Sequence, residues 1–510
     1  MIALITILAM IAAACSSDDS NAVLPPVEAE PDAVVNEEAA DTTTTAPATT
    51  TPTTTTIGPT TTTRPDLRGT TIQVAVADHP TMDLIQSLTE EFFTEPTGIE
   101  VEFITLVEQT LRELVSLDAV PQDHFEVFMI DPFTASQFGA NGWIQDLAPL
   151  AADNQAYNLD GFIPSLLDIN RSSPVYDGFS SVRRDRIGQR GEDLFSVPFF
   201  AESSIIMFNQ EVMDDAGINF PEAPTWQEIA DIARQFESEA TTGICLNGIP
   251  EWNQLGAALT TVVNTFGGTW WESNDDGTPG QPQINQPDSP FRTATEFYLN
   301  LATDYGTDNF AETGFAQCLD QFQNGGAAIW YDTTAAAPLL ESANSPVAGN
   351  VGYARAPIAQ TDASGALWTW GLAVPAVADV PDAAQEFALW ATSPDTIELM
   401  AELAPNGWND PAVIGAATRS SHFEIPEFQE ATDPYGDIVF AELTAADPDN
   451  PGTTPRPGTS GIQYVGIPEF QDAATECSVE FATAVEGWIT IDEALDNCQA
   501  IAQEIADAYR

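Results

Sequence analysis

Residues 71–130 alternate between strand and helix patterns, and this rhythm constrains the fold more than any other feature of the chain. Three strand-like runs rich in Val, Ile and Phe are separated by two runs with helical spacing, in the order 71–77, 83–93, 98–104, 108–118 and 125–130. Such an order predicts a parallel sheet with helices on both faces. Ligands bind these sheets at the carboxyl ends of the strands. His79, Glu108 and Asp131 stand at or just beyond such ends.

Two later segments have the character of chain crossings between two lobes. Residues 194–208 and 367–375 are extended and apolar, but Pro and polar residues interrupt them. Between these segments, Thr225 followed by Glu228 forms a capping-box pattern, which predicts the start of a helix. Residues 380–391 have the apolar spacing of an amphipathic helix. The folded part therefore continues the mixed strand and helix pattern to the C-terminal region.

The N-terminal region predicts export. Residues 1–15 form an apolar run that ends in small residues and Cys15, as in a lipoprotein signal peptide. The run lacks the usual Lys or Arg at its start, and the alternative is an apolar helix of the mature fold. Residues 16–66 are dominated by Asp, Glu, Pro and Thr, which predicts a disordered Thr/Pro-rich stalk. We therefore expect a protein outside the cytoplasm that a lipid on Cys15 anchors to the cell membrane.

The charge of the chain excludes several classes of partner. The chain has 77 acidic and 14 basic residues, a net charge of −63, and all of its basic residues are Arg. Nucleic acid and anionic lipid surfaces both need a basic footprint, so neither is an expected partner. After the signal and stalk, roughly 445 residues remain, which is ample for two lobes. No apolar run in that remainder approaches the length of a membrane span.

Four cysteines follow Cys15, and an even number outside the cytoplasm favours disulfides. Three pairings of Cys245, Cys318, Cys477 and Cys498 are possible. Cys477 and Cys498 flank a helical stretch and a turn, so we expect them to pair, which leaves Cys245 with Cys318. Metal binding is the weaker alternative because the spacings are wide and the three histidines are scattered. We expect no metal and no cofactor.

Four motifs lie at 128–133, 142–147, 197–209 and 325–332. They resemble the extracellular solute-binding proteins of ABC importers, in the large carbohydrate-binding family, and the resemblance extends from about residue 71 to the C-terminus. Further segments are similar to the polyol-binding members, those for sorbitol and mannitol, at 198–204, 243–246, 261–268, 368–370 and 461–471. The resemblance implies an α/β, two-lobed periplasmic-binding fold of type II. Each lobe would be a mostly parallel sheet flanked by helices, and hinge strands would join the two.

The same resemblance implies a domain division and a set of partners. Lobe 1 would comprise 67–198 and 372–418, and lobe 2 would comprise 199–371 and 419–510. The two lobes would close over a small sugar alcohol or sugar and present it to the permease subunits of the importer. We expect a monomer that contacts the membrane only through its lipid anchor.

A polyol site needs hydrogen-bonding groups for many hydroxyls and aromatic faces for the C–H surface. Carboxylates accept several hydrogen bonds, and Trp adds flat area and one donor. Candidates from loops, strand ends and crossings are His79, Glu108, Asp131, Glu202, Trp252, Trp270, Asp332, Trp370 and Arg419. Each has a structural alternative: the tryptophans as core, Arg419 as the partner of an acid, His79 as a helix cap, and Glu108 as a solvated helix residue.

Two other classes compete with a binding protein. A secreted carbohydrate-active hydrolase would need two carboxylates that flank the scissile bond. Acids are so frequent here that close pairs arise by chance, and no motif of nucleophilic or zinc catalysis is present. A surface adhesion module would need neither a hinge nor a polar cleft. The sequence therefore favours a binding protein over an enzyme.

Overall fold

The computed structural model describes residues 66–118, 125–171, 193–236, 241–275, 277–363, 365–448, 450–452 and 461–510. Contacts divide the chain into Met1–Arg64 and Pro65–Arg510, and all the described residues belong to the second unit. The predicted signal peptide, the lipidated Cys15 and the stalk up to residue 65 lie outside the described residues.

The first of two main sheets has five strands in the order β2-β1-β3-β11-β4. Their bounds are β1 Thr71–Ala77, β2 Glu100–Leu106, β3 Val127–Ile130, β4 Val197–Glu202 and β11 Trp368–Ala373. Strand β1 runs parallel to both β2 and β3, as the strand and helix rhythm predicts. Strand β11 is antiparallel to both β3 and β4.

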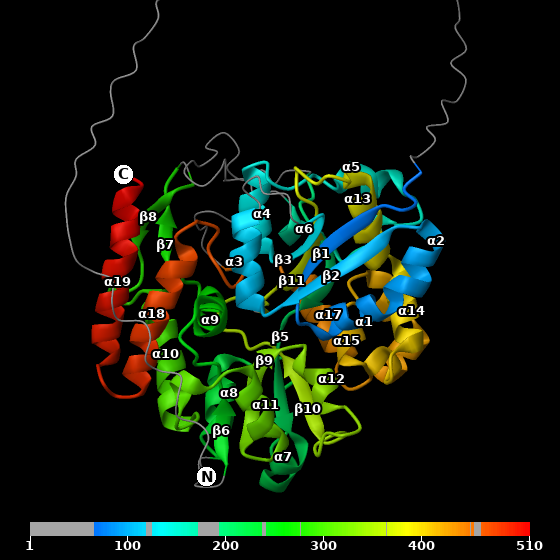
Figure 1. The fold of residues 1–510 in the computed structure, drawn as a ribbon. Coiled ribbons are helices and arrows are strands. Elements are labelled where there is room, and N and C mark those ends of the chain that lie inside the picture. The colour runs from blue at the N-terminus through cyan, green and yellow to red at the C-terminus, as the bar shows by residue number, and fades with distance from the viewer. Residues whose placement is uncertain are drawn as a thin grey trace, which may run out of the picture. The chain divides into compact units, whose positions relative to one another are not determined.

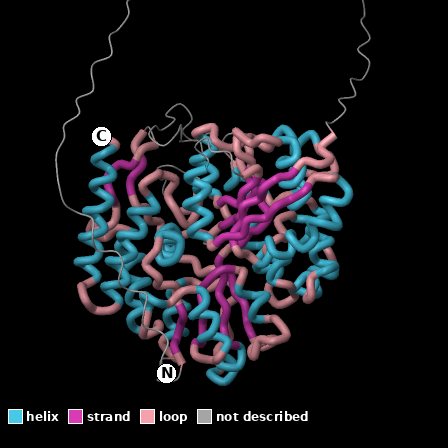
Figure 2. The backbone as a smooth tube through the Cα atoms, in the orientation of Figure 1, coloured by secondary structure: helices cyan, strands magenta, loops and turns pink. Residues whose placement is uncertain are grey.

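The second main sheet has four strands in the order β10-β5-β9-β6. Their bounds are β5 Ser204–Asn209, β6 Thr242–Cys245, β9 Ala327–Thr333 and β10 Val351–Arg355. A separate ribbon pairs β7 (Trp271–Ser273) with β8 (Pro279–Pro282). Figure 2 shows the strands of the two main sheets as separate groups with helices around both.

Most strands of each sheet run in one direction, as expected, and one strand in each sheet runs against them. This strand is β11 in the first sheet and β5 in the second. The reason is that β5 and β11 each follow a crossing between the sheets. A strand that enters from the other sheet runs antiparallel to the strands with which it pairs.

The α-helices are α1 Pro80–Thr89, α2 Glu95–Thr97, α3 Glu108–Asp118, α4 Pro132–Ala140, α5 Ala148–Asp153, α6 Pro164–Asn170, α7 Gln210–Ala216, α8 Trp226–Ala233, α9 Ala257–Thr265, α10 Pro290–Tyr305, α11 Phe315–Gln323, α12 Ala336–Leu340, α13 Pro381–Ala391, α14 Pro394–Leu403, α15 Pro411–Ile414, α16 Pro426–Ala431, α17 Gly436–Ala445, α18 Phe470–Val485 and α19 Ile491–Ala508. Shorter 3₁₀ and π turns are η1 Glu90–Thr94, η2 Leu159–Gly161, η4 Trp252–Gly256, η5 Phe310–Glu312, η6 Gly407–Asn409 and η7 Ser420–Glu424. In Figure 1, α3 and α4 lie on one side of the first sheet, and α1, α2 and α14 lie on the other.

Local sequence signals account for several element boundaries. The Thr225 side chain accepts from the Glu228 amide, and Glu228 reciprocates, so the predicted capping box at α8 is confirmed. Helix α3 occupies the predicted 108–118. Asp131 caps α4 by accepting from the Thr134 amide. In β1, Ile72 and the consecutive residues Val74–Ala77 are buried, as expected for an inner strand that is covered on both faces.

The chain crosses between the main sheets at two places. Strand β4 stays in the first sheet through Glu202, which pairs with Trp368 of β11, and β5 starts the second sheet at Ser204. The second crossing lies between Arg355 and Trp368. Both junctions differ from the expected lobe boundaries after 198 and 371, because the β4–β11 hydrogen-bond ladder holds these residues in the first sheet.

Two apolar clusters support the two sheets. The first contains the core of the first sheet and also Phe423, Tyr435 and Leu443, which lie in the region 419–510 expected in lobe 2. The second surrounds Ile329 and extends to helices α18 and α19. The C-terminal region is therefore divided between the clusters rather than assigned to one of them.

Each apolar cluster contains one disulfide, Cys245–Cys318 in the first and Cys477–Cys498 in the second. Cys245 of β6 is bonded to Cys318 of α11, and Cys477 of α18 is bonded to Cys498 of α19. These are the two pairs that the sequence led us to expect. No helix in the described part of the chain combines the length and apolarity needed to cross a membrane.

Candidate functional site

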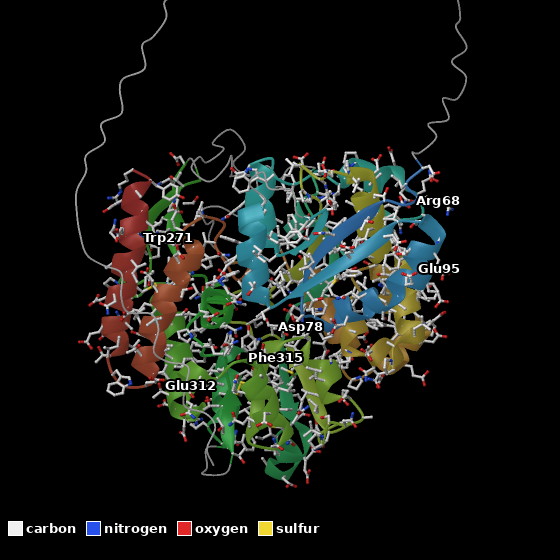
Figure 3. The ribbon with its side chains drawn as sticks, in the orientation of Figure 1. Arg68, Asp78, Glu95, Trp271, Glu312 and Phe315 are labelled. Carbon is white, nitrogen blue, oxygen red and sulfur yellow. A yellow bond between two sulfur atoms is a disulfide. The ribbon has the colours of Figure 1, made fainter. Side chains whose placement is uncertain are left out.

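A pocket of about 360 Å³ is lined by residues from both main sheets. The lining consists of His79, Glu108, Phe200, Glu202, Ser203, Ser204, Asn247, Asn253, Gln254, Ala257, Ala258, Thr261, Phe315, Tyr331, Asp332, Thr333, Ala335, Ala366, Trp368, Trp370 and Gln463. It includes both chain crossings, the end of β9 and the start of α9. In Figure 3, Phe315 and Asp78, the neighbour of His79, lie in the central region between the two sheets.

Glu202 and Asp332 place two carboxyl groups at the centre of this lining. Burial raises the pKa of Glu202 to about 7; a hydrogen bond with the Thr333 side chain lowers it, and the charges of Asp332 and Glu108 raise it. Burial also raises the pKa of Asp332 to about 6, against hydrogen bonds from the Thr333 amide and the Trp330 indole. Those two donors lie 2.8 and 3.1 Å from the Asp332 oxygens. No Arg or Lys is among the lining residues.

Glu108 differs from these two acids because a cation accompanies it. Arg112, one helical turn later on α3, donates through Nη2 to Glu108 Oε1 at 2.9 Å and also forms an ion pair with buried Asp131. Burial alone would lower the pKa of Arg112, but Asp131 and Glu108 together hold it above its usual value. The Glu108 side chain remains 45% exposed.

Three indole rings surround the Arg112 guanidinium. Its Cζ lies 5.0 Å from the ring centroid of Trp370, 5.6 Å from that of Trp252 and 5.8 Å from that of Trp368. These distances are within the range of cation–π attraction. Trp252 belongs to η4, whereas Arg112 belongs to α3, so the cluster ties together elements that are distant in sequence. Trp368 and Trp370 also present surface to the pocket.

Side-chain amides add acceptors on a different wall. Asn247 donates through Nδ2 to Gln254 Oε1 at 2.7 Å. The Oδ1 atoms of Asn247 and Asn253 are buried without a hydrogen-bond partner. Asn253 and Gln254 belong to the π turn η4, where the Gly256 amide donates to the carbonyl of Glu251. Such wide turns recur at functional sites, and this one directs two amides toward the pocket.

His79 is both a helix cap and a lining residue. Its Nδ1 accepts from the Thr81 amide at 3.2 Å at the start of α1. Its ring packs edge-on against Phe200, with centroids 4.5 Å apart. Burial lowers the pKa of His79 to about 4, although the charge of Asp78 opposes this shift. The imidazole is therefore neutral at physiological pH.

The pocket brings together five of the nine residues singled out from the sequence. His79, Glu108, Glu202, Asp332 and Trp370 line it. Asp131 and Trp252 lie behind this lining, where both contact Arg112. Trp270 and Arg419 do not line it, so we do not include them in the proposed site.

Trp270 and Arg419 are structural residues because each is buried with its own partners. The Trp270 indole donates to Thr260 Oγ1 at 3.0 Å inside the second cluster. Its neighbour Trp271 lies away from the central region, beside α19 (Figure 3). Arg419 donates to the carbonyl oxygens of Asn158 and Thr392 and lies over the Tyr157 and Phe162 rings.

Several residues in the pocket lining or next to it escaped the sequence reasoning. Arg112 follows Glu108 by four residues on a predicted helix, so an i, i+4 pairing rule could have found it. Trp368 precedes Trp370 by two residues on an extended segment, so both indoles share one face. Gln463 lies in the segment 461–471 that is similar to the polyol-binding members, whereas the amides of Asn247 and Asn253 carry no such signal, because polar amides are common in loops. In the part of the chain that the structure describes, no group of three or more potential metal ligands is present.

Comparisons with known proteins agree with this architecture. Residues 77–398 match the family described as bacterial extracellular solute-binding protein. The chain belongs to this family. It therefore acts outside the cytoplasm as a solute-binding protein of the ABC-importer type, and the hydrolase alternative is set aside.

Individual relatives cover most of the chain. A mannitol-binding protein of Pseudomonas aeruginosa is 31% identical over 435 residues, 84% of this chain and 91% of the relative. A solute-binding protein of Agrobacterium vitis S4, solved with bound D-mannitol, superposes with a TM-score of 0.73 at 31% identity and covers 86% of this chain and 99% of its own. An Agrobacterium radiobacter K84 protein in complex with ribitol has a TM-score of 0.68 at 20% identity, with the same coverage of 86% and 99%, and supports the fold alone.

Proposed function

We propose that this solute-binding protein captures a sugar alcohol or a sugar in the pocket between its two main sheets and delivers it to the permease of an ABC importer. The observation that carries the proposal is the composition of the pocket: carboxylates and amides together with indole faces, and no Arg or Lys. Relatives named for mannitol and for erythritol or L-threitol support the same class of solute.

The pocket chemistry suits a hydroxyl-rich guest. Carboxylates bind hydroxyl groups through charge-assisted hydrogen bonds, which are stronger than those between neutral groups. The faces of Trp368 and Trp370 offer flat apolar area for the C–H surface. An anionic solute would meet Glu202 and Asp332 without a lining cation to compensate it. The proposal therefore excludes sugar acids and sugar phosphates as favoured ligands.

Closure of the two halves would occur about the crossings at Ser203 and at 356–367. Residues at the ends of elements absorb such hinge motions, and a ligand drives closure only through contacts that the closed state alone provides. Glu202 and Trp368 stand directly at these crossings, so bound solute would contact the hinge itself. The closed form would be the one that the permease recognises.

We also propose the lipid attachment and the monomeric state that the sequence predicts. A lipid on Cys15 would hold the protein at the cell membrane, and residues 16–66 would act as the spacer. Lipid attachment is tested by metabolic labelling with an alkyne fatty acid, in the natural chain and in a Cys15→Ala variant. The protein would act as a monomer, which sedimentation of the folded part checks.

Calorimetric titration of the folded part tests the ligand class. The ligands are D-mannitol, D-sorbitol, ribitol, erythritol, D-glucose and maltose. Glu202→Ala and Asp332→Ala should each cost on the order of 1–3 kcal/mol of binding free energy, the range for loss of a charged hydrogen-bond partner. The exposed Glu312 of η5 provides the control variant Glu312→Ala, whose affinity should not change. Absence of binding to every ligand, or unchanged affinity in both pocket variants, would refute the proposal.

A further inference from the structure

Three hydroxyl donors of the pocket lining are committed to partners within the protein. The Ser203 hydroxyl donates to the carbonyl of Ala366 at 2.6 Å, and the Thr261 hydroxyl donates to the carbonyl of Ala257 at 2.9 Å. Tyr331 donates to Ser204 at 3.2 Å. These hydroxyls can still accept hydrogen bonds, but donating to a guest would require each to give up its present acceptor.

Two side-chain amide nitrogens of the lining are committed in the same way. Asn247 Nδ2 donates to Gln254 at 2.7 Å, and Gln463 Nε2 donates to the carbonyl of Leu367 at 2.7 Å. Gln463 Oε1 in turn accepts from the Leu367 amide at 3.2 Å. Both the amide nitrogen and the amide oxygen of Gln463 are therefore hydrogen-bonded to Leu367 at the second crossing. This residue stabilises the pocket wall more than it contributes to ligand binding.

Several acceptors of the lining have unused hydrogen-bonding capacity. The Oδ1 atoms of Asn247 and Asn253 are buried and have no partner. Asp332 receives only the Thr333 amide and the Trp330 indole on two oxygens that can together accept about four hydrogen bonds. Glu202 interacts with the Thr333 side chain, and the charges nearest to it are those of Asp332 and Glu108. The pocket therefore presents several hydrogen-bond acceptors with unused capacity, and carboxyl oxygens are among them.

The charge balance points in the same direction. Arg112 is shared between Glu108 and Asp131, so its charge is already matched. His79 is the one imidazole in the lining, and burial keeps it neutral. Glu202 and Asp332 thus face the pocket without a cation of their own. Over the whole chain a net charge of −63 also attracts cations and repels anions at long range.

We propose that the pocket selects polyhydroxylated solutes that carry an amine, with the ammonium group placed between Glu202 and Asp332. This inference rests on the proposed function, because it assumes that the hydroxyl-rich guest occupies this pocket. A hydroxyl group brings one donor along with its acceptor lone pairs, whereas an ammonium group brings three donors and no acceptor. It also supplies a positive charge next to two carboxylates that have no cation among the lining residues.

A matched set of ligands tests the inference at constant carbon skeleton. D-Sorbitol ends in hydroxyls, D-glucamine replaces one terminal hydroxyl by an amine, and D-gluconate carries a terminal carboxylate. We expect D-glucamine to bind about tenfold more tightly than D-sorbitol in calorimetry at pH 7.5 and low salt, which equals about 1.4 kcal/mol. D-Gluconate should bind more weakly than both. The same comparison is made between D-mannitol and its terminal amine.

Isosteric variants assign the preference to the two unmatched acids. Glu202→Gln and Asp332→Asn keep size and hydrogen bonding but remove charge, so each should reduce the amine preference severalfold and alter D-sorbitol affinity less. Glu108→Gln is the matched control, because this carboxylate, unlike the other two, has an ion-pair partner in Arg112. It should change both affinities by a similar factor and preserve their ratio.

The outcomes separate this inference from the function on which it rests. If a neutral polyol binds and its amine does not bind more tightly, the amine preference is refuted while the polyol-binding function stands. If the amine binds and the neutral parent does not, the inference is supported in its strongest form. If no polyol binds, with or without an amine, the proposed function and this inference fail together.

Discussion

Replacement of Arg112 by Leu tests whether its ion pairs hold the lining together. Arg112 is 16% exposed and Asp131 only 2% exposed, so the Arg112–Asp131 pair is mostly buried. Arg112→Leu would leave the Asp131 carboxylate in place without its cation. Removing one partner of a buried pair typically costs about 3–5 kcal/mol, because the remaining charge is uncompensated.

The structure places the expected cost at the lower end of that range. Asp131 keeps hydrogen bonds from Thr134, at 2.9 Å from the amide and 2.8 Å from the hydroxyl, and these still stabilise its charge. Leu also retains part of the contact with the three indoles. We therefore expect Arg112→Leu to lower the free energy of unfolding by about 3 kcal/mol. Adding Asp131→Asn removes the stranded charge but keeps the helix cap, so the double variant should recover about half of that loss.

Urea denaturation followed by tryptophan fluorescence measures these differences. The control is Arg234→Leu, which removes an exposed ion pair with Asp231 at 3.1 Å, whose partners are 62% and 49% exposed. It should cost less than about 1 kcal/mol. An Arg112→Leu variant as stable as this control would refute the reasoning, and so would a double variant less stable than Arg112→Leu alone.

Three further predictions concern other parts of the chain. Replacing both Cys477 and Cys498 by Ala opens a bridge across a sequence separation of 21 and should cost about 3 kcal/mol by the loop-entropy relation. Trp270→Phe removes the hydrogen bond to Thr260 and should cost about 1–3 kcal/mol in stability, with solute affinity unchanged. Glu202 has its pKa raised from 4.5 to about 7, so the native state retains a proton that the unfolded chain loses. Its contribution to the free energy of unfolding should therefore fall as pH rises from about 4.5 to about 7, and Glu202→Gln should gain stability relative to the natural chain across that window.

Each of these predictions has a contrary result. Reduction opens both disulfides in the natural chain but only Cys245–Cys318 in the cysteine variant. It should therefore lower the free energy of unfolding of the natural chain more than that of the variant, and an equal loss in both would contradict the assignment. Loss of solute binding in Trp270→Phe, with the fold intact by circular dichroism, would return that residue to the site. For Glu202, the exposed Glu312→Gln serves as the control. A stability difference that does not change between pH 4 and pH 8 would exclude the proposed titration.

Much of the fold could be predicted because its signals are local. The strands β1 and β5, the helix α3 and the capping box at Thr225 each depend on residues within one or two turns. The disulfide pairs could be reasoned from spacing and context. The parallel arrangement of β1, β2 and β3 follows from their helical connections. The antiparallel places of β5 and β11 could not be predicted this way, since their neighbours come from distant segments.

Some residues of the candidate site could likewise be predicted from the sequence, and others could not. The acids Glu202 and Asp332 stand at strand ends that the sequence marks, and both line the pocket. Trp270 and Arg419 look equally suitable in sequence, because burial against Thr260 or against the Tyr157 ring has no local signature. An indole or a guanidinium is useful to a ligand only if packing leaves it exposed to the cavity.

By itself, the sequence determined the order of strands and helices, the acidic character and the kind of chemistry available at the strand ends, because these depend on neighbouring residues or on composition. Tertiary structure alone decided which of those groups line the same cavity and which of them have an ion-pair or hydrogen-bond partner. The position of Arg112 between Asp131, Glu108 and three indoles exists only when α3, β11 and η4 pack together. That packing gives Glu108 an ion-pair partner and leaves Glu202 and Asp332 with no Arg or Lys among the lining residues. The electrostatics of a buried group depend on its spatial neighbours and not on its neighbours along the chain.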